Sequence, residues 1–241
     1  MWRFVLNPSV TVLLPVRNGA RWLAEAVDSV LKQTYDAWTL LVLDDGSMDG
    51  SVAVAHEACL GDARCYVVPM GHLGLTAVLR AGVEMSWTPW IARLDADDQM
   101  MPDRLSTQIR VAEEGEFAIL GSSVEVDGKM VYYPAKDVEC RAAMSGWRPR
   151  NPFAHSAVLF NRKAALYAGN YDPRWSYCQD LALWIEMAYT AGSRIGNLES
   201  LLTVLGTHPD QRSRHAWRRR WYGWRIALDA KRRGLNMTLA G

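Results

Sequence analysis

Residues 10–43 read VTVLLPVRNGARWLAEAVDSVLKQTYDAWTLLVL, a stretch with an apolar run at each end and a helical pattern between them. The apolar runs Val10–Leu14 and Thr39–Leu43 have the length and the β-branched content of buried strands. Apolar residues of Ala20–Gln33 recur at helical spacing, which predicts a helix with one apolar face. The order strand, helix, strand indicates two parallel strands joined by a crossover helix.

The same alternation continues as far as residue 98. Further apolar runs lie at Cys65–Val68 and Trp90–Leu94, and helical patterns precede them at Ser51–Leu60 and Leu73–Met85. We therefore expect an α/β fold with a doubly wound, mostly parallel sheet.

The second half of the chain has a different pattern. A helix is expected at Pro102–Glu114 and a strand at Phe117–Leu120, followed by a β-hairpin within Val124–Tyr133 whose turn is Asp127-Gly128. Further expected elements are a strand at Ser156–Phe160 and helices at Arg162–Ala168 and Asp180–Ala191. We expect one domain over residues 1–210, with halves at 1–98 and 99–210, and a basic helical tail at 211–241.

Composition places the chain among folded soluble proteins. Of its 241 residues 49% are apolar and 22% are charged, which excludes a disordered chain. Apolar runs stay well below the ~18 residues of a membrane span, and the first residues lack the pattern of a signal peptide. The four cysteines form no Cys-x-x-Cys pair, which is typical of free thiols in a reducing compartment. These observations favour a cytoplasmic location.

Charge is distributed unevenly along the chain. Residues 211–233 carry nine basic side chains against one acidic side chain, so the remainder has a net charge of −7. In a helical tail, Trp217, Trp221, Trp224 and Leu228 form one apolar stripe flanked by arginines. Such a helix either packs on the domain or lies on an anionic membrane surface through residues 212–233. Nucleic acid is disfavoured as a partner because the acidic body repels phosphate.

Clusters of aspartates follow two of the expected strands. Asp44 and Asp45 come directly after the second strand, where they either cap a turn or face a ligand. Asp95, Asp97 and Asp98 follow the fourth strand, and three carboxylates so close together repel one another unless a cation neutralises them. Hard oxygen ligands suit Mg²⁺ or Mn²⁺, which complete their coordination shell with substrate phosphates. The pattern favours a nucleoside diphosphate ligand.

Seven short motifs in consistent order, within residues 8–210, resemble those of the family 2 glycosyltransferases with the GT-A nucleotide-sugar fold. They are Val12-Leu-Leu-Pro-Val-Arg-Asn18, Ser29-Val-Leu-Lys-Gln-Thr-Tyr35, Leu43-Asp-Asp-Gly-Ser47, Ala92-Arg-Leu-Asp-Ala-Asp-Asp98, Met101-Pro-Asp-Arg-Leu105, Asn151-Pro-Phe-Ala-His155 and Gln179-Asp-Leu-Ala-Leu-Trp184.

The resemblance implies a donor site at the ends of the first strands. By analogy with the family, Pro15, Val16 and Arg17 would line the pocket for the base and ribose. Asp44 would bind the nucleobase or ribose, and Asp95, which opens the D-x-D motif, would contact the ribose or the donor sugar.

The resemblance also implies a divalent cation, Mn²⁺ or Mg²⁺. Asp97 would be its ligand, Asp98 would assist or replace it, and His208 is a further candidate ligand. His155 would either touch the donor or serve as a hydrogen-bonded structural histidine. Arg212 or Arg214 is a candidate contact for the diphosphate, with a solvated surface position as the alternative.

Asp180 matches the catalytic base of the family, and Gln179 before it is a candidate substrate contact. A helix N-terminus lowers the pKa of a carboxyl group, so a useful base at this position requires burial or a neighbouring carboxylate. By this analogy the acceptor hydroxyl gives its proton to Asp180 and attacks the anomeric carbon, which inverts its configuration.

The implied activity is a metal-dependent, inverting hexosyltransferase reaction. It would move a sugar, from a UDP-sugar in the first instance, to a glycan or lipid-linked glycan during the synthesis of cell-surface polysaccharide or lipopolysaccharide. The enzyme would act in the cytoplasm or peripherally on the inner face of the cell membrane. Two alternatives are a binding or assembly module that has kept the fold without turnover, and a nucleotidyltransferase. The latter requires a glycine-rich phosphate loop, for which Arg17-Asn18-Gly19 is too short.

Overall fold

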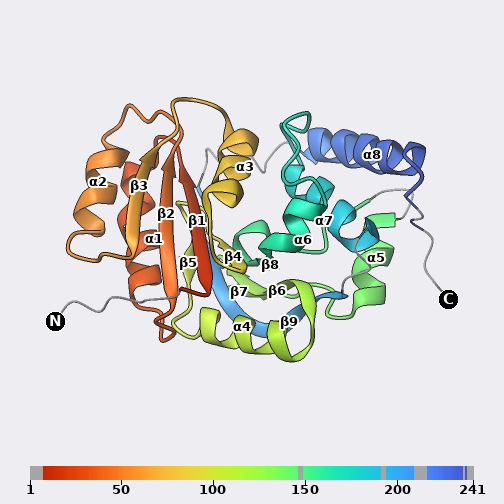
Figure 1. Cartoon of the computed structure of the whole chain (residues 1–241), viewed down its shortest axis with the longest axis horizontal. Helices are drawn as coiled ribbons and strands as arrows, with labels where there is room; N and C mark the ends of the chain where they lie inside the picture. The colour runs from red at the N-terminus through yellow and green to blue at the C-terminus, as the bar shows by residue number, and fades with distance from the viewer. Residues whose placement is uncertain (1–7, 146–148, 191–193, 209–215, 236, 238–241) are drawn as a thin grey trace.

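The computed structural model describes residues 8–145, 149–190, 194–208, 216–235 and 237, with only the backbone of 216–219. A curled sheet runs through the molecule, and helices pack on both of its faces (Figure 1). The predicted α/β class is therefore confirmed.

The first half of the chain contains four parallel strands joined by helices. Every element predicted here is present, and its ends lie within two residues of their predicted positions. The bounds are β1 (Val10–Val16), α1 (Ala20–Leu31), β2 (Trp38–Asp44), α2 (Ser51–Ala58), β3 (Cys65–Pro69), α3 (Leu75–Met85) and β4 (Trp90–Arg93). The strands pair in the order β3-β2-β1-β4, so the sheet grows from β1 in both directions.

The second half extends the same sheet with strands of both directions. Its elements are β5 (Gln99–Met100), α4 (Arg104–Glu114), β6 (Phe117–Val126), β7 (Lys129–Val131), α5 (Asp137–Ser145), a 3₁₀ turn (His155–Ala157), β8 (Leu159–Asn161), α6 (Arg162–Tyr167), α7 (Gln179–Thr190), β9 (Arg194–Leu205) and α8 (Ala216–Arg232). Beyond β4 the order continues β8-β6-β9-β5, with β8 antiparallel to both neighbours and β9 parallel to β6.

Three elements of the second half were not predicted, namely β5, α5 and the long strand β9. The sequence of β9 contains Gly196, Asn197 and Glu199, which break the apolar pattern of a strand. Its pairing with β6 also shifts register near Ser122 and Ser123. A Cβ at Gly196 would lie 2.6 Å from the Ala135 carbonyl oxygen, so this glycine permits a close approach between chain segments. The predicted strand at 156–160 is shorter, because its first residues form the 3₁₀ turn.

The predicted hairpin turn is confirmed. Asp127 and Gly128 have φ values of 50° and 72°, the left-handed conformations of a type I′ turn between β6 and β7.

The core lies in two layers, one on each face of the sheet. Along β1, Val12 and Leu14 pack in the layer formed with α1, α2 and α4. Leu13 lies in the other layer, with α3, α7 and part of α8. This alternation is the two-residue period of a strand covered on both faces.

The tail helix α8 packs on the domain, and the tryptophan stripe is not its packing face. Ile226, Ala227 and Ala230 are buried in the same layer as α7, whereas Trp221 and Trp224 are each 47% exposed. The side chain of Trp217 lies outside the described residues. In the part of the chain that the structure describes, no helix is both long and apolar enough to span a bilayer.

Candidate active site

A cavity of about 1220 Å³ opens at the carboxyl ends of β1 and β4, where the sheet changes from parallel to mixed pairing. Its walls come from both halves of the chain. They include residues 15–19, 95–98, 149–151, 153–156, 176–181 and 205–208, together with part of α8. Open α/β sheets bind ligands at such a point.

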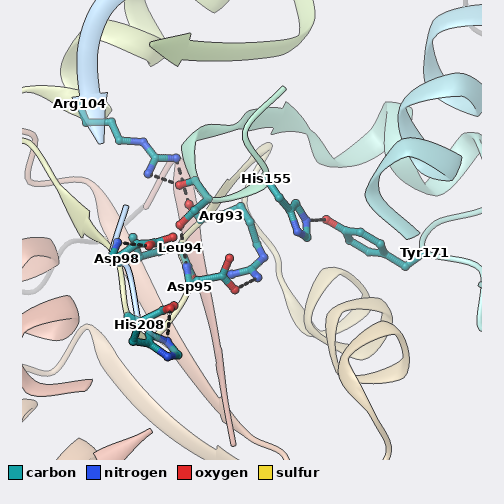
Figure 2. A network of polar contacts seen from close by, with 11 residues as sticks. Arg93, Leu94, Asp95, Asp98, Arg104, His155, Tyr171 and His208 are labelled. Atoms are coloured by element: carbon teal, nitrogen blue, oxygen red, sulfur yellow. Dashed lines mark hydrogen bonds and ion pairs between the residues drawn. The ribbon is translucent and has the colours of Figure 1, made fainter. Parts of the chain in front are cut away.

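Behind the cavity, the buried guanidinium of Arg104 joins the strand end to the 3₁₀ turn (Figure 2). Arg104 Nη1 donates to the Ser156 carbonyl at 2.7 Å, and Nη2 donates to the carbonyls of Arg93 at 3.0 Å and Val158 at 3.3 Å. Its Nε donates to Gln108 Oε1 at 3.0 Å. Burial lowers the pKa of Arg104 to about 9, and the neighbouring Asp98 acts in the opposite direction.

Arg93, the last residue of β4, is also fully buried, and its guanidinium forms an ion pair with Asp95 (Figure 2). The Asp95 backbone N–H donates to Ser156 Oγ at 2.8 Å. Burial acts to raise the pKa of Asp95, but the positive charge and the hydrogen bond of Arg93, together with the effect of His155, outweigh it, and the pKa lies below its usual range. Arg93 therefore keeps Asp95 ionised.

Asp98 differs from Asp95, because its surroundings favour the protonated form of the carboxyl group. Its side chain is buried, and Oδ1 accepts the Gly206 backbone N–H at 2.8 Å. Burial, together with the negative charges of Asp95 and Asp97, raises the pKa of Asp98 to about 8.

Asp97 lies beside His208, which the chain brings back from the end of β9. Asp97 Oδ2 and His208 Nε2 are 2.8 Å apart. The His208 ring stacks on the indole of Trp22 in α1, with ring centroids 4.3 Å apart. Three separate chain segments thus fix this pair.

The geometry of this cluster fits a divalent cation that is shared with a phosphate ligand. Among the residues that the structure describes, His208 Nδ1 is buried without a hydrogen-bond partner, and three carboxylates lie within four residues of one another. Among the described residues, no group of three or more His, Cys, Asp or Glu side chains is arranged to enclose a metal by itself. Mg²⁺ and Mn²⁺ are often held by only one or two side chains plus substrate phosphates. Asp97 and His208, with Asp98 beside them, match that arrangement.

Asp180 lies on the same cavity, in the first turn of α7. Its Oδ2 accepts from Asn151 Nδ2 at 2.6 Å, and its Oδ1 accepts the Leu181 backbone N–H at 2.9 Å. Burial raises the pKa of Asp180, and the negative charge of Asp95 adds to this rise. The backbone hydrogen bond acts in the opposite direction but does not cancel it. Gln179 before it is buried and also lines the cavity.

His155 lies on the cavity wall and is hydrogen-bonded. Its Nε2 is 2.9 Å from the hydroxyl oxygen of Tyr171 (Figure 2). Burial, together with the positive charge of Arg93, lowers the pKa of His155 to about 3, so the ring is neutral. This hydrogen bond agrees with the interpretation of His155 as a structural histidine. Because the ring also lines the cavity, it is placed to contact a ligand as well.

Pro15, Val16 and Arg17 line the cavity where β1 ends, at the position expected for the base and ribose pocket. Arg212 and Arg214, the candidate diphosphate contacts, lie outside the described residues.

The two aspartates after β2 have different surroundings. Asp44 is buried and accepts the Ser47 backbone N–H at 3.2 Å. Asp45 accepts the Gly74 backbone N–H at 3.0 Å, and it is Asp45, rather than Asp44, that lies among the described residues lining the cavity.

Several residues of the site were missed from the sequence. Asn151, Arg93 and Arg104 each lie in a quoted motif, yet no role was predicted for them. A charged residue within the apolar run Trp90–Leu94 was a signal that could have identified Arg93, because an arginine in a fully buried strand requires a partner.

Comparison with known proteins agrees with this geometry. The family model described as glycosyl transferase family 2 matches residues 11–169. The chain belongs to this family. Two relatives of this family 2 chain are the putative glycosyltransferase EpsE of Bacillus subtilis (strain 168) and the amylovoran biosynthesis glycosyltransferase AmsE of Erwinia amylovora. Each is 26% identical to it; EpsE is matched over 81% of this chain and 72% of its own length, AmsE over 87% and 80%.

Solved structures show that this family 2 chain has the GT-A fold. The mannosyltransferase PcManGT from Pyrobaculum calidifontis, in complex with GDP-Man and Mn²⁺, has a TM-score of 0.71 at 20% identity over 94% of this chain. S. aureus TarS in complex with UDP-GlcNAc has a TM-score of 0.72 at 13% identity over 86% of this chain. The chain spans 65% of the first structure and 61% of the second, less than two thirds of each.

The buried guanidinium of Arg104 is expected to be a large contributor to stability. Arg104→Met leaves the carbonyls of Ser156 and Arg93 without this donor, and each buried acceptor left unsatisfied costs about 1–3 kcal/mol. Urea unfolding measures the loss. The control is Arg110→Met on the same helix, where the side chain is exposed and paired only with Glu114, and a change below ~1 kcal/mol is expected. Equal effects of the two substitutions would contradict the assigned role.

The raised pKa of Asp98 predicts a dependence of stability on pH. An unfolded aspartate has a pKa of about 3.9, so the folded state, with its pKa of about 8, favours the protonated form. The contribution of Asp98 is then fully present below about pH 4 and is lost as the pH rises through about 8. In cation-free protein, Asp98→Asn should match the wild type near pH 4 and become the more stable protein by about pH 8. Urea titrations across this range measure the difference, and a difference independent of pH would exclude the raised pKa.

Proposed function

We propose that the chain is a metal-dependent, inverting glycosyltransferase that moves a sugar from a nucleoside-diphosphate sugar to a glycan acceptor. One observation carries the proposal: the Asp180 carboxylate and the Asp97–His208 pair line the same cavity. UDP-sugars are the first choice of donor and a lipid-linked glycan of the cell surface is the preferred acceptor. Support comes from the ligands named for the TarS and PcManGT structures and from the role in amylovoran biosynthesis named for AmsE.

In the proposed reaction, Asp180 acts as the base. The acceptor hydroxyl gives its proton to the Asp180 carboxylate, and its oxygen bonds to the anomeric carbon of the donor. The bond from that carbon to the diphosphate oxygen breaks at the same time, and the electron pair leaves with the nucleoside diphosphate. Attack opposite the leaving group inverts the anomeric configuration without a covalent enzyme intermediate.

Two neighbours prepare Asp180 for this role. Asn151 and the Leu181 backbone N–H each bond one carboxylate oxygen, which fixes the direction of the side chain. Burial raises the pKa of Asp180, which makes its carboxylate a stronger proton acceptor than a solvated aspartate.

In this proposal, the other predicted residues would bind the donor. Pro15, Val16 and Arg17 would surround the base and ribose, with Asp44 behind them, in register with Val16 at the end of β2. Asp95, held ionised by Arg93, would face the ribose or sugar. A bound Mn²⁺ or Mg²⁺ would offset the negative charge of the leaving diphosphate. In this assignment residues 1–98 are the nucleotide-binding half and residues 99–210 the acceptor-side half.

Nucleotide binding is the first expected outcome. UDP, GDP, dTDP and CDP are each added with and without Mn²⁺, and the melting temperature is measured. A ligand that binds only the folded state raises this temperature by mass action. One nucleotide should produce a metal-dependent rise, and Asp97→Asn should remove the metal-dependent part. A folded protein that responds to none of the four would contradict the proposal.

Removal of the base should separate binding from turnover. Asp180→Asn is expected to reduce kcat by about 10²–10⁴-fold, while the nucleotide-induced rise in melting temperature is retained. Release of nucleoside diphosphate from UDP- and GDP-sugars, with octyl glycosides as acceptors, measures the rate. The control is Asp28→Asn, an exposed carboxylate on α1 that pairs with Lys32. A wild type that binds nucleotide but gives no turnover above Asp180→Asn would favour a binding or assembly module.

We also propose that α8 lies on an anionic membrane surface, on the cytoplasmic side of the cell membrane. Its packed face is occupied by the domain, whereas Trp221 and Trp224 stay half-exposed and Arg225 lies 4.6 Å from the Trp221 ring centroid. Exposed tryptophans among arginines are typical of helices at the headgroup level.

Point substitutions test this surface. Deleting residues 212–241 would also remove Ile226 and Ala230 from the core, so Trp221→Ser with Trp224→Ser is the better variant. Burial of one large apolar side chain contributes roughly 1.5–3 kcal/mol, so cosedimentation with anionic vesicles should weaken at least ~10-fold. Trp87→Ser, an exposed tryptophan after α3, is the control and should leave binding unchanged. Unchanged cosedimentation of the double variant would exclude α8 as the membrane contact.

A further inference from the structure

Helix α8 closes the end of the cavity where Asp180 lies. A Cβ at Gly223 would lie 3.3 Å from the Pro149 carbonyl oxygen and 3.7 Å from the nearest side-chain carbon of Leu181. The missing side chain at position 223 thus lets α8 approach both the 149–151 segment and the first turn of α7. These three segments meet beside the Asp180 carboxylate.

Two arginines stand at this meeting point. Arg220 precedes Gly223 by three residues and therefore lies on the same face of α8. Arg150 follows Pro149 directly. Both arginines are exposed, and both line the cavity.

Neither arginine has a counter-charge within the described ranges. No ion pair or side-chain hydrogen bond is formed by Arg150 or Arg220 there, in contrast to Arg93, which is paired with Asp95. His208 is likewise engaged by Asp97. The cavity lining therefore contains an acidic cluster and, beside Asp180, two guanidinium groups that have no counter-charge among the described residues.

Which substrate would contact the two arginines depends on which substrate binds at the Asp180 end of the cavity. If Asp180 is the base, as proposed above, its side of the cavity receives the acceptor hydroxyl. Attack comes from the side opposite the leaving diphosphate, so the donor diphosphate lies away from this end. Guanidinium groups match the geometry of phosphate and carboxylate oxygens, with which they form strong paired hydrogen bonds.

We propose that Arg150 and Arg220 form an oxyanion-binding subsite for the acceptor. The acceptor is accordingly a glycan that carries a phosphate or a carboxylate close to the sugar that receives the new residue. This inference relies on the proposed function for the side of the cavity from which the acceptor attacks. It adds to that function that the acceptor is anionic.

The test measures binding of small sugar acids at moderate salt concentration. Glucose 1-phosphate, glucuronate and glucose are added to the full chain, with and without the nucleoside diphosphate identified by the thermal panel and Mn²⁺. At least one anionic sugar should raise the melting temperature, and neutral glucose should not. The two acids distinguish a phosphate from a carboxylate as the group recognised.

Arg150→Gln and Arg220→Gln should each weaken binding of the anionic sugar by about tenfold, and the double variant should abolish it. Lys231→Gln removes an exposed charge from the same helix outside the cavity and should change nothing. Arg220→Lys should retain part of the affinity, because it keeps the charge without the planar fork.

Three results would overturn the inference. The first is the absence of a shift with either acid while the nucleotide shift is intact, which leaves the proposed function standing. The second is an equal response of the arginine variants and Lys231→Gln. The third is that the arginine variants lose as much affinity for the nucleotide as for the sugar acid. The two arginines would then bind the donor rather than the acceptor. Failure of nucleotide binding itself is measured separately and would count against the proposed function instead.

Discussion

The arrangement of this site depends on a positive charge buried behind it. The guanidinium of Arg104 donates to carbonyls from β4 and from the segment around the 3₁₀ turn, and it adds to the Asp95–Ser156 and Arg93–Val158 hydrogen bonds that already join these segments. Burial of a guanidinium is costly unless its donors are paired, so these hydrogen bonds hold the carbonyls in one geometry. The end of β4, from which the aspartates of the cavity follow, therefore has a fixed position relative to the second half of the chain.

A second buried arginine gives neighbouring carboxylates different charges. Arg93 keeps Asp95 ionised, whereas Asp98, three residues later, has a pKa of about 8 because it is buried beside the other acids. Two identical side chains three residues apart therefore differ in their affinity for protons. A cation that enters the cluster meets an ionised group at one side and displaces a proton at the other, so its binding is expected to strengthen as the pH rises.

The sequence predicted what depends on local pattern and missed what depends on contacts between distant residues. The strands of the first half are buried on both faces, so each is a continuous apolar run that can be recognised. Asp180 was identified as a candidate base through the resemblance of its motif to the family, and the structure has it, as expected, in the first turn of a helix. The contact between Asn151 and Asp180, 29 residues apart, was missed because no periodicity reports it. Asp97 and His208, 111 residues apart, were brought together only by the family resemblance, which implied that both could bind one cation. Strand β9 was missed because Gly196 and Asn197 serve the close approach of other segments rather than the strand pattern.

The sheet order also has a consequence for how the protein is made. Strand β5 follows the aspartate cluster immediately, but its partner is β9, about a hundred residues later in the chain. During synthesis the first four strands can pair as soon as they emerge, whereas the segment after Asp98 has to wait for residues 194–205. A ribosome-bound chain therefore exposes an incomplete site for much of its elongation. Contacts this distant in sequence also slow folding, so the last strand sets the time at which the protein becomes able to bind.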